Sequence, residues 1–512
     1  MEAEIEIGIA PLTPEQLRDV ADGSRKVRIP AAARERIQNG RRTVEKMIDR
    51  NDRPVYSINT GFGSLKNVRI PKDKLDQLQL NIIRSHSVGV GDPLPKSVVR
   101  GMMLLRAHSL ATGHSGVRPE VVDLMVEMLN RDIVPVVPCQ GSVGASGDLA
   151  PLAHMALAMI GEGTVEWNGE RVPSKKAFAD ASLKPLTPAA KEGLALLNGT
   201  QMMTAMGGLA LLRGENALRH VDVAAAMTLE AVLGTPKAYD ERVHKLRPHP
   251  GQTDAAYNLR LLTAGSEIST SHRDCDRVQD AYSVRCAPQV HGAGRDALTY
   301  VRSVLEREMN SVTDNPILFP GEKDPIASAG NFHGQPVAVA LDTMALALTG
   351  VASISERRIF RLLDPKLSEL PAGLTSDAGL KSGLMMAQVT AASLVSECKT
   401  LSHPASVDSI PTWADQEDHV SMGAFAARKA EQIVDAFEKV IAIELICAAQ
   451  GLEYRKPLRP SKGVEAAVKA LRTVVPSVTE DRQLTPDFEV AVGLIRSRTL
   501  LEAVQDVVGE LK

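Results

Sequence analysis

Four long stretches of helical pattern in the second half of the chain constrain its fold more than any other feature. They cover about residues 289–310, 336–363, 382–401 and 420–452. Because an α-helix rises 1.5 Å per residue, each would be roughly 30 Å long or more. Helices of this length cannot bury their apolar faces inside one compact monomer. The pattern therefore predicts a mainly α-helical bundle that continues into neighbouring subunits.

The composition agrees with a helical protein. Only 3% of the 512 residues are aromatic, whereas Ala, Leu, Met and Glu are plentiful, which favours packed helices over sheets. The net charge of −3 argues against a nucleic-acid partner. The acidic start, Met1–Glu4, lacks the apolar core of a signal peptide. The longest apolar run, 337–354, contains Asp342 and is interpreted as a buried core helix. We expect a cytoplasmic protein with no membrane partner.

The chain is long for one domain. We expect one intertwined unit with an approximate boundary at residue 200, so that residues 1–200 carry a glycine-rich loop and residues 201–512 carry the long helices. Two shorter helices are expected after about Arg455. Strand content is expected to be small, with a hairpin at 164–172 around an Asn-Gly turn. The five cysteines show no metal-binding spacing, and their odd number suits reduced thiols.

The glycine-rich loop reads GSVGASGDLAPLAH over residues 141–154. Its centre, Ala145-Ser146-Gly147, can build an electrophile from the backbone. The Gly147 nitrogen attacks the Ala145 carbonyl carbon, loss of water closes a five-membered ring, and loss of the Ser146 hydroxyl leaves an exocyclic methylidene. Gly147 offers an unhindered nitrogen and permits unusual dihedral angles. Asp148 is then expected to be the N-cap of a helix.

The loop also has two simpler interpretations, a chance occurrence and a phosphate site. A bare Ala-Ser-Gly occurs by chance in roughly one chain in five of this length at average composition. A glycine-rich turn before a helix can also cradle phosphate. No Lys-Ser/Thr pair follows the loop, however, and Pro135 and Pro138 spoil the strand that would precede a phosphate site.

The whole segment resembles the cofactor loop of the aromatic amino acid ammonia-lyases and aminomutases. Similar segments recur along almost the whole chain, at 55–63, 196–201, 271–286 and 330–336 and at 411–420. The resemblance implies a long-helix bundle of the ammonia-lyase and fumarase type. It also implies the prosthetic group 4-methylideneimidazole-5-one (MIO), formed from the central tripeptide, with no metal or nucleotide. Together with the long helices, it predicts a homotetramer with shared active sites.

The resemblance assigns catalytic roles to residues on several segments. Tyr56 matches the family's catalytic base. Asn198 matches the asparagine whose amide contacts the prosthetic group and the substrate amine. Tyr282 would lie beside the prosthetic group, with Gln279 in the surrounding network. Arg285 would bind the substrate carboxylate, for which a guanidinium fork is well suited.

Four further residues are expected to contact the side chain of the substrate. By the resemblance, His86 touches its ring, Phe332 lines the pocket, and Gln416 and Glu417 lie on the loop most informative about the substrate. A carboxylate at Glu417 suits an imidazole N–H, whereas the similar phenylalanine and tyrosine enzymes lack an acid there. The expected reaction is elimination of ammonia from L-histidine to give trans-urocanate.

The chain departs from the histidine-type pattern at a few positions. Ser57 stands where such members usually have glycine, and Ala281 stands where they usually have proline. Trp413 and Asp415 replace residues that are usually small and Asn, respectively. These departures bear on the shape of the loops that carry the expected base and substrate pocket.

Two alternatives therefore stay open. One is a lyase or aminomutase specific for tyrosine or phenylalanine, because residues 83–87 and Gly334-Gln335 resemble tyrosine aminomutases. The other is a helical scaffold that has lost catalysis and acts as an interaction module. The intact Ala-Ser-Gly tripeptide, with Tyr56, Asn198 and Arg285, argues against the scaffold.

The chemistry explains why these residue types belong together. The ammonium group must become a leaving group, and a weakly acidic β-proton must be removed. An electrophilic methylidene serves the first need and Tyr56 the second. Since a phenol of pKa about 10 is a poor base at neutral pH, we expect positive potential to lower the pKa of Tyr56. Arg285 and the helix N-terminus at Asp148 are the expected sources.

Overall fold

The computed structural model describes residues 4–50 and 54–512 and forms two compact units. Residues 1–3 of the acidic start, where we expect no signal peptide, lie outside the described residues. The first unit comprises the chain up to Leu209 together with Arg302–Asp342 and Pro404–Arg428. The second comprises Ala210–Val301, Thr343–His403 and Lys429–Lys512.

The first unit contains short helices and short strands. Its helices are α1 (Pro14–Ala21), α2 (Ala31–Arg50), α3 (Leu75–His86), α4 (Lys96–Ala111), α5 (Pro119–Asn130), α6 (Leu149–Met159), α7 (Ser174–Asp180) and α8 (Glu192–Leu197), with 3-10 turns η1 (Gly63–Leu65) and η2 (Lys72–Lys74). Its strands are β1 (Ile5–Glu6), β2 (Val27–Arg28), β3 (Val90–Pro93), β4 (Val134–Pro135), β5 (Pro138–Gln140), β6 (Thr164–Trp167), β7 (Glu170–Pro173), β8 (Ile317–Leu318) and β9 (Ile326–Ala327).

The strands form small separate sheets. β1 and β2 form a parallel pair, whereas the other sheets are antiparallel. In these, β3 pairs with β5, β8 pairs with β9, and β4, β6 and β7 form a three-stranded sheet in that order. The predicted hairpin is confirmed as β6–β7, with Trp167 opposite Glu170. Its turn residues Asn168 and Gly169 have φ of +51° and +81°, the left-handed geometry that a two-residue hairpin turn needs.

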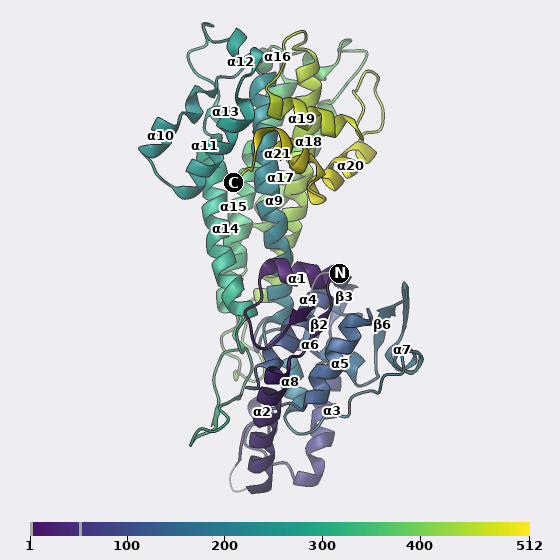
Figure 1. The fold of residues 1–512 in the computed structure, drawn as a ribbon. Helices are drawn as coiled ribbons and strands as arrows, with labels where there is room; N and C mark the ends of the chain where they lie inside the picture. Colours follow the sequence, from purple (N-terminus) through teal and green to yellow (C-terminus); the bar gives the residue numbers. More distant parts are fainter. Residues whose placement is uncertain (1–3, 51–53) are drawn as a thin grey trace. The chain divides into compact units, whose positions relative to one another are not determined.

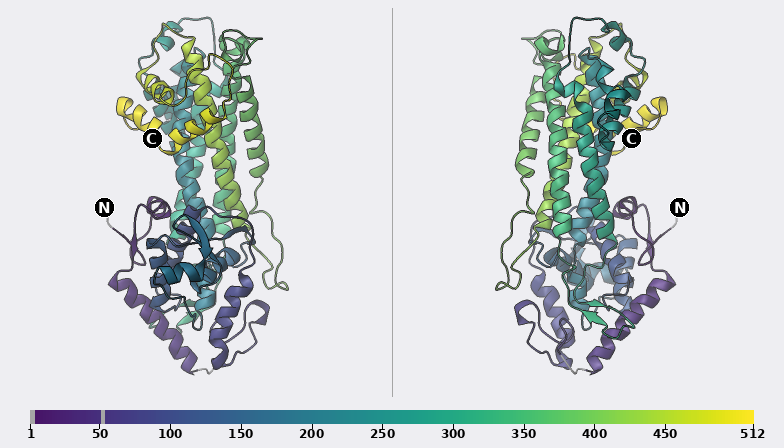
Figure 2. Two further views of the ribbon diagram at one scale, coloured as in Figure 1. Left: turned by 90° about the vertical axis from the view of Figure 1, so that its right-hand side faces the viewer. Right: turned by 90° about the vertical axis from the view of Figure 1, so that its left-hand side faces the viewer.

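Four long helices have residues in both units: α9 (Gln201–Ala231), α14 (Ala287–Met309), α15 (Gln335–Leu363) and α18 (Gly423–Glu453). With α17 (Met385–Leu401) they run side by side in the second unit (Figures 1 and 2). The four predicted long stretches correspond to α14, α15, α17 and α18, so the predicted mainly α-helical fold is confirmed. The boundary near residue 200 stays a prediction, since the units interleave along the chain.

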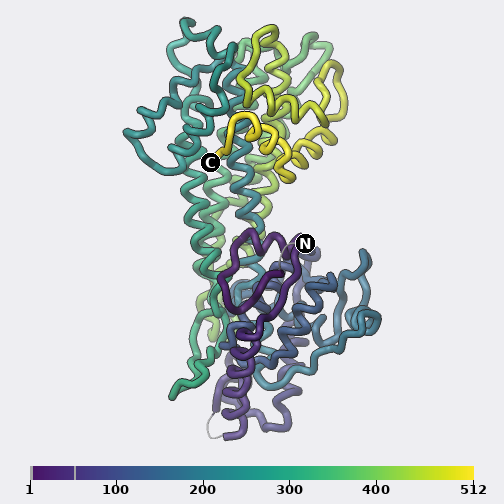
Figure 3. The backbone as a smooth tube through the Cα atoms, in the orientation of Figure 1, coloured from purple at the N-terminus to yellow at the C-terminus, as the bar shows by residue number. Residues whose placement is uncertain are grey.

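The rest of the second unit consists of shorter elements. These are η3 (Pro236–Tyr239), α10 (Glu241–Lys245), α11 (Pro250–Thr263), α12 (Glu267–Ser271), α13 (Tyr282–Arg285), α16 (Pro365–Ser368), η4 (Ala372–Leu374), α19 (Lys462–Arg472), α20 (Thr485–Arg496) and α21 (Thr499–Val508). The chain returns onto this unit at its C-terminal end (Figure 3), where the Lys512 N–H donates to Asn258 Oδ1 at 3.0 Å.

The number of C-terminal helices differs from the prediction. Three helices, α19 to α21, follow Arg455 in the described part of the chain, where two were expected. The break between α20 and α21 falls at Arg498, whose φ is +65°. A left-handed residue ends a helix, but this position usually carries glycine. The sequence therefore had no glycine or proline to mark the break.

Helix α15 has an apolar face that this chain does not cover. Of the described helices, it alone is long and apolar enough to cross a membrane by length and composition, and 67% of its most apolar window is buried. That burial agrees with the predicted core helix. Val339, Leu346 and Phe360 nevertheless remain 39%, 53% and 41% exposed. Helix α17 likewise exposes Met385 and Met386.

Candidate active site

The glycine-rich loop lies between β5 and α6 and folds back on itself. Gly144 and Gly147 pair across a tight turn, with Ala145 and Ser146 at its tip. Both glycines have positive φ, +73° and +74°, which glycine adopts at little cost. Ser142 Oγ accepts from the Gly144 N–H at 3.1 Å and donates to the Gly147 carbonyl oxygen at 3.0 Å. The predicted tripeptide thus occupies a compressed turn.

Two distant segments hold this turn in place. A Cβ added to Gly147 would lie 2.1 Å from the Gly199 carbonyl oxygen, so no side chain fits there. The Asp148 N–H donates to the same oxygen at 2.7 Å. From the other side, the Met422 N–H donates to the Val143 carbonyl oxygen at 2.9 Å.

Asp148 has a different partner from the one expected. Helix α6 opens just after it, as predicted, but its side chain makes no cap hydrogen bond to that helix. Its Oδ2 instead accepts from the backbone N–H groups of Met202 and Met203 at 2.9 and 3.0 Å. The carboxylate therefore caps the first turn of α9 and ties the loop to it. Burial raises the pKa of Asp148 to about 7.

Asn198 follows α8 and lies beside the loop. Its Nδ2 donates to the Asn315 carbonyl oxygen at 3.1 Å, while its Oδ1 is buried without a hydrogen-bond partner in the described part of the chain. A buried acceptor left unsatisfied is costly. The position therefore fits a substrate group that brings a donor.

A buried arginine donates a hydrogen bond to the backbone of Asn198. Arg106 on α4 is fully buried and its Nη1 donates to the Asn198 carbonyl oxygen at 2.6 Å and to Gln201 Oε1 at 3.0 Å. This residue was not among those predicted for the site. The sequence does contain one indication, a single arginine inside the apolar run 102–107. An arginine is almost never fully buried without partners, so its position in such a run points to polar partners in the core.

The tip of the loop opens into a pocket of about 810 Å³. Every described residue that lines it belongs to the first unit. The pocket brings together eight of the predicted site residues: Tyr56, His86, Ala145, Ser146, Asn198, Phe332, Gln416 and Glu417. Lining residues that the sequence analysis did not single out include Thr60, Lys66, Asn67, Asn315, Thr412 and His419.

Glu417 faces the tip of the loop. Its Oε1 is 3.5 Å from Ser146 Oγ, and its Oε2 accepts from Thr412 Oγ1 at 2.6 Å. The backbones of Thr412 and Glu417 also pair, with N–H to carbonyl distances of 3.0 and 3.4 Å. Thr412 therefore orients the carboxylate. The spacing of Thr412 and Glu417 in the sequence does not by itself predict this contact, because the contact depends on the turn between them.

Trp413 and Asp415, the two residues of this loop that depart from the histidine-type pattern, lie within that turn. Trp413, Ala414 and Asp415 have φ of +49°, +53° and +57°, so three successive residues adopt a conformation that a Cβ disfavours. The Trp413 indole packs on Gly63, where an added Cβ would lie 2.1 Å from Nε1. Next to it, Lys66 donates to the Gln416 side chain.

Tyr56 lies in the loop before η1. Its hydroxyl accepts from the Gly63 N–H at 3.4 Å, and its ring contacts Phe62 edge to face, with 6.3 Å between centroids. Burial raises the pKa of Tyr56, and the negative charge of Glu417 raises it further. The expected lowering of this pKa is therefore not found: Arg285, the cation assigned to that task, is not among the causes of the shift.

The neighbour of Tyr56, Ser57, is one of the departures from the histidine-type pattern. Ser57 has a φ of +64°, so the glycine usual in histidine-type members is the residue that suits this backbone best. Its buried Oγ has no partner among the residues described. Nothing in the contacts of Ser57 offsets these two costs.

Of the four other predicted residues, Gly147 lies in the loop itself, and the remaining three belong to the second unit; none of the four lines this pocket. Tyr282 on α13 is 71% exposed, and the Arg285 guanidinium carbon lies 4.6 Å from the centroid of its ring, a cation–π contact. Arg285 Nε is buried without a partner in the described ranges. Gln279 is exposed. Their approach to the pocket residues stays a prediction.

The sequence matches the aromatic amino acid lyase family over residues 12–473. The chain belongs to this family. The family recognised from the loop and its companion segments is therefore confirmed. A histidine ammonia-lyase of Sorangium cellulosum is 53% identical, covering 98% of this chain and 99% of its own length. One of Deinococcus radiodurans is also 53% identical, covering 96% and 94%.

Solved structures confirm the fold. A histidine ammonia-lyase of Trypanosoma cruzi has a TM-score of 0.92 and 42% identity, covering 99% of this chain and 96% of its own. A tyrosine aminomutase of Streptomyces globisporus has a TM-score of 0.94 and 35% identity, covering 100% of both chains. The predicted long-helix bundle of the ammonia-lyase type is therefore correct, and both substrate types are represented among its structural relatives.

We predict that Glu417→Gln lowers the pKa of both Tyr56 and His86. Burial is the largest influence on the pKa of His86 and lowers it. The charge of Glu417 raises the pKa of His86 and also that of Tyr56. Removing an anion favours the deprotonated form of an imidazole and of a phenol alike. Histidine NMR titration and ultraviolet titration of tyrosinate, with Tyr56→Phe as the reference, measure the two shifts.

The matched control for this prediction is Asp418→Asn. Asp418 lines the same pocket, but its charge is not a cause of either shift. Equal effects of the two substitutions would contradict the placement of Glu417 between Tyr56 and His86.

Proposed function

We propose that the protein eliminates ammonia from L-histidine to give trans-urocanate. The observation that carries this proposal is the position of Glu417 in one pocket with His86 and the tip of the Ala145-Ser146-Gly147 turn. A carboxylate acceptor there can bind an imidazole N–H by a charge-assisted hydrogen bond. The names of the curated relatives agree with this substrate.

The tripeptide turn fits the family's prosthetic group. We infer that MIO forms from Ala145, Ser146 and Gly147; when formed, it supplies the electrophilic carbon for the reaction. Two observations support this: the compressed turn and the lack of room for a Cβ at Gly147. The proposal needs neither a metal nor a nucleotide.

Each residue around the turn has a separate role in the proposed reaction. Tyr56 removes the β-proton, and Asn198 Oδ1 accepts from the substrate amine. Glu417 holds the imidazole N–H, while His86, Phe332 and Gln416 surround the ring. Because burial and Glu417 keep the pKa of Tyr56 high, the proposal requires a nearby positive charge when substrate is bound. Arg285, on the substrate carboxylate, is the residue assigned to supply it.

The positions of Arg285, Tyr282 and Gln279 support a shared site. We propose a homotetramer in which these second-unit residues complete the pocket of a neighbouring subunit. The uncovered apolar side chains of α15 and α17 support such an assembly, since patches of this kind mark association surfaces. A cytoplasmic location stays part of the proposal.

A second candidate has a specific observation in its favour. The tyrosine aminomutase of Streptomyces globisporus covers this chain completely, and residues 83–87 with Gly334-Gln335 resemble such enzymes. That candidate is a tyrosine or phenylalanine lyase or aminomutase with the same prosthetic group. Incubation with His, Tyr and Phe separates the substrates by the ultraviolet absorbance of their products, and free ammonia separates a lyase from a mutase.

The prosthetic group predicts a change in mass. If Ala145-Ser146-Gly147 cyclises and dehydrates, the intact protein weighs about two waters less than its sequence. Ser146→Ala restores one or both waters and removes most of the activity. Intact-protein mass spectrometry measures both, and a wild-type mass equal to the plain sequence would refute the proposal.

Substrate choice predicts a selective loss in Glu417→Gln. A hydrogen bond to a charged group contributes about 1.5–3 kcal/mol, so kcat/KM for histidine should fall roughly ten- to 150-fold. Any residual turnover of tyrosine or phenylalanine should change little, because neither brings an N–H to that position. Kinetics on all three amino acids measure this. Equal losses would indicate that Glu417 only supports its loop.

The shared site predicts complementation between two inactive variants. Subunits of Tyr56→Phe and Arg285→Ala, once mixed and exchanged, should regain activity through hybrid sites with both native residues. Tyr56→Phe mixed with Asn198→Ala is the matched control: Tyr56 and Asn198 line one pocket of one chain, so no hybrid site has both. An active monomer in solution scattering would exclude the shared site.

A further inference from the structure

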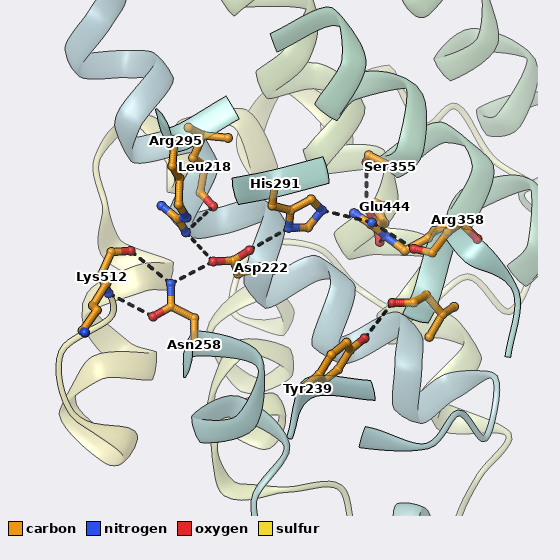
Figure 4. A network of polar contacts seen from close by, with 12 residues as sticks. Leu218, Asp222, Tyr239, Asn258, His291, Arg295, Ser355, Arg358, Glu444 and Lys512 are labelled. Carbon is orange, nitrogen blue, oxygen red and sulfur yellow. Dashed lines mark hydrogen bonds and ion pairs between the residues drawn. The ribbon is translucent and has the colours of Figure 1, made fainter. Parts of the chain in front are cut away.

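A chain of fully buried polar side chains links four helices of the second unit (Figure 4). Asp222 Oδ1 on α9 lies 2.7 Å from His291 Nδ1 on α14. His291 Nε2 lies 3.2 Å from Arg358 Nη1 on α15. Arg358 donates to both carboxylate oxygens of Glu444 on α18, at 2.6 and 2.9 Å. We call these four residues the Asp222–Glu444 network; none of them has a role in the proposed reaction.

The protonation of the network follows from its donors. A guanidinium only donates, so His291 Nε2 must accept from Arg358, and Nδ1 carries the proton donated to Asp222. Burial lowers the pKa of His291, in agreement with a neutral ring. Arg295 also pairs with Asp222. With a neutral imidazole, the two arginines balance the two carboxylates.

Stability alone does not explain such a network. Buried charges lose their hydration, and well-packed apolar side chains of the same volume often stabilise a fold equally well. The remaining donors indicate another role. Arg358 Nη1 lies 3.3 Å from the Ser283 carbonyl oxygen, and the hydroxyl of the fully buried Tyr239 donates to the next carbonyl oxygen, that of Val284, at 2.9 Å.

Both carbonyl groups belong to α13, which is only one turn long. A single turn is not stable by itself, because its few hydrogen bonds do not offset the cost of ordering the backbone. The buried donors therefore hold α13 from the inside. On its outer side α13 presents Tyr282, with the Arg285 guanidinium over its ring.

We propose that Tyr239 and Arg358 are positioning residues that fix the backbone of α13 and so aim Arg285 at the substrate carboxylate. The rest of the Asp222–Glu444 network holds Arg358 in the orientation that this requires. The inference rests on the proposed function, in which Arg285 binds that carboxylate.

The first test compares two ligands in Tyr239→Phe, which removes one hydroxyl group. Trans-urocanate carries the carboxylate that Arg285 would bind, and histamine lacks it. Loss of one hydrogen bond to the α13 backbone should weaken urocanate inhibition about two- to tenfold. The KM for histidine should rise by a similar factor, and histamine inhibition should stay unchanged. A general loosening of the fold would weaken both ligands equally, and that result would overturn the inference.

Tyr454→Phe is the matched control. The Tyr454 hydroxyl also donates to a backbone carbonyl oxygen of the second unit, that of Leu374, at 3.1 Å, but it does not touch α13. This variant should leave both inhibition constants unchanged. If Tyr239→Phe behaves like Tyr454→Phe, with no change in urocanate inhibition, the positioning role is wrong.

Two further variants separate this inference from the proposed function. Arg358→Lys keeps a cation beside Glu444 but cannot reach Glu444 and the Ser283 carbonyl together, so it should reproduce the urocanate-specific loss. Arg285→Ala tests the carboxylate role itself. Unchanged urocanate inhibition in Arg285→Ala would refute that role. Weakened inhibition in Arg285→Ala with none in Tyr239→Phe would refute only the positioning.

Discussion

The backbone of Gly147 packs directly on that of Gly199, and the first unit is arranged around this contact. It brings the loop after β5 against the segment that follows α8, while the segment before α18 closes on the loop from the other side. Each contact is made by backbone atoms, so glycine is needed for steric reasons at the contact itself. The Asp148 carboxylate then fastens the loop to the first turn of α9. A turn held so tightly suits a reaction of the backbone with itself.

The electrostatics of the pocket are incomplete within the first unit. Glu417 supplies a negative charge beside Ser146, and burial keeps the Tyr56 phenol protonated. In the proposed reaction this phenol is the base, so a nearby cation would favour it. Arg285, the residue assigned to that task, belongs to the second unit and contacts the Tyr282 ring. This division would give the proposed assembly an electrostatic reason, separate from the apolar faces of the long helices.

The second unit combines a buried polar network with a helix of a single turn, α13. Arg295 and Arg358 balance the charges of Asp222 and Glu444, hydrogen bonds link the residues of the Asp222–Glu444 network, and further donors reach α13. A helix this short has few hydrogen bonds of its own with which to hold Arg285 in its proposed place. Support from buried side chains on the long helices gives it a fixed backbone without covering its outer side.

Local features of the chain were predictable from the sequence. The long helices follow from a periodic pattern of apolar residues, and the β6–β7 hairpin follows from its Asn-Gly turn, because both depend on neighbouring residues. The chemistry of the tripeptide follows from its residue types, whereas the six other pocket residues came from resemblance to a family and not from spacing. The third C-terminal helix was missed, since Arg498 adopts a conformation that usually marks glycine.

Only the tertiary structure decided which distant segments meet. Asp148 caps α9 and not α6, Thr412 orients Glu417, and Arg106 supports Asn198 from inside α4. Each of these hydrogen bonds satisfies a polar group at a place created by packing. The pKa of Tyr56 is raised for the same reason, because burial and a neighbouring carboxylate are properties of the folded pocket. The sequence determined the helices and the Ala145-Ser146-Gly147 tripeptide; packing determined the partners and the charges around them.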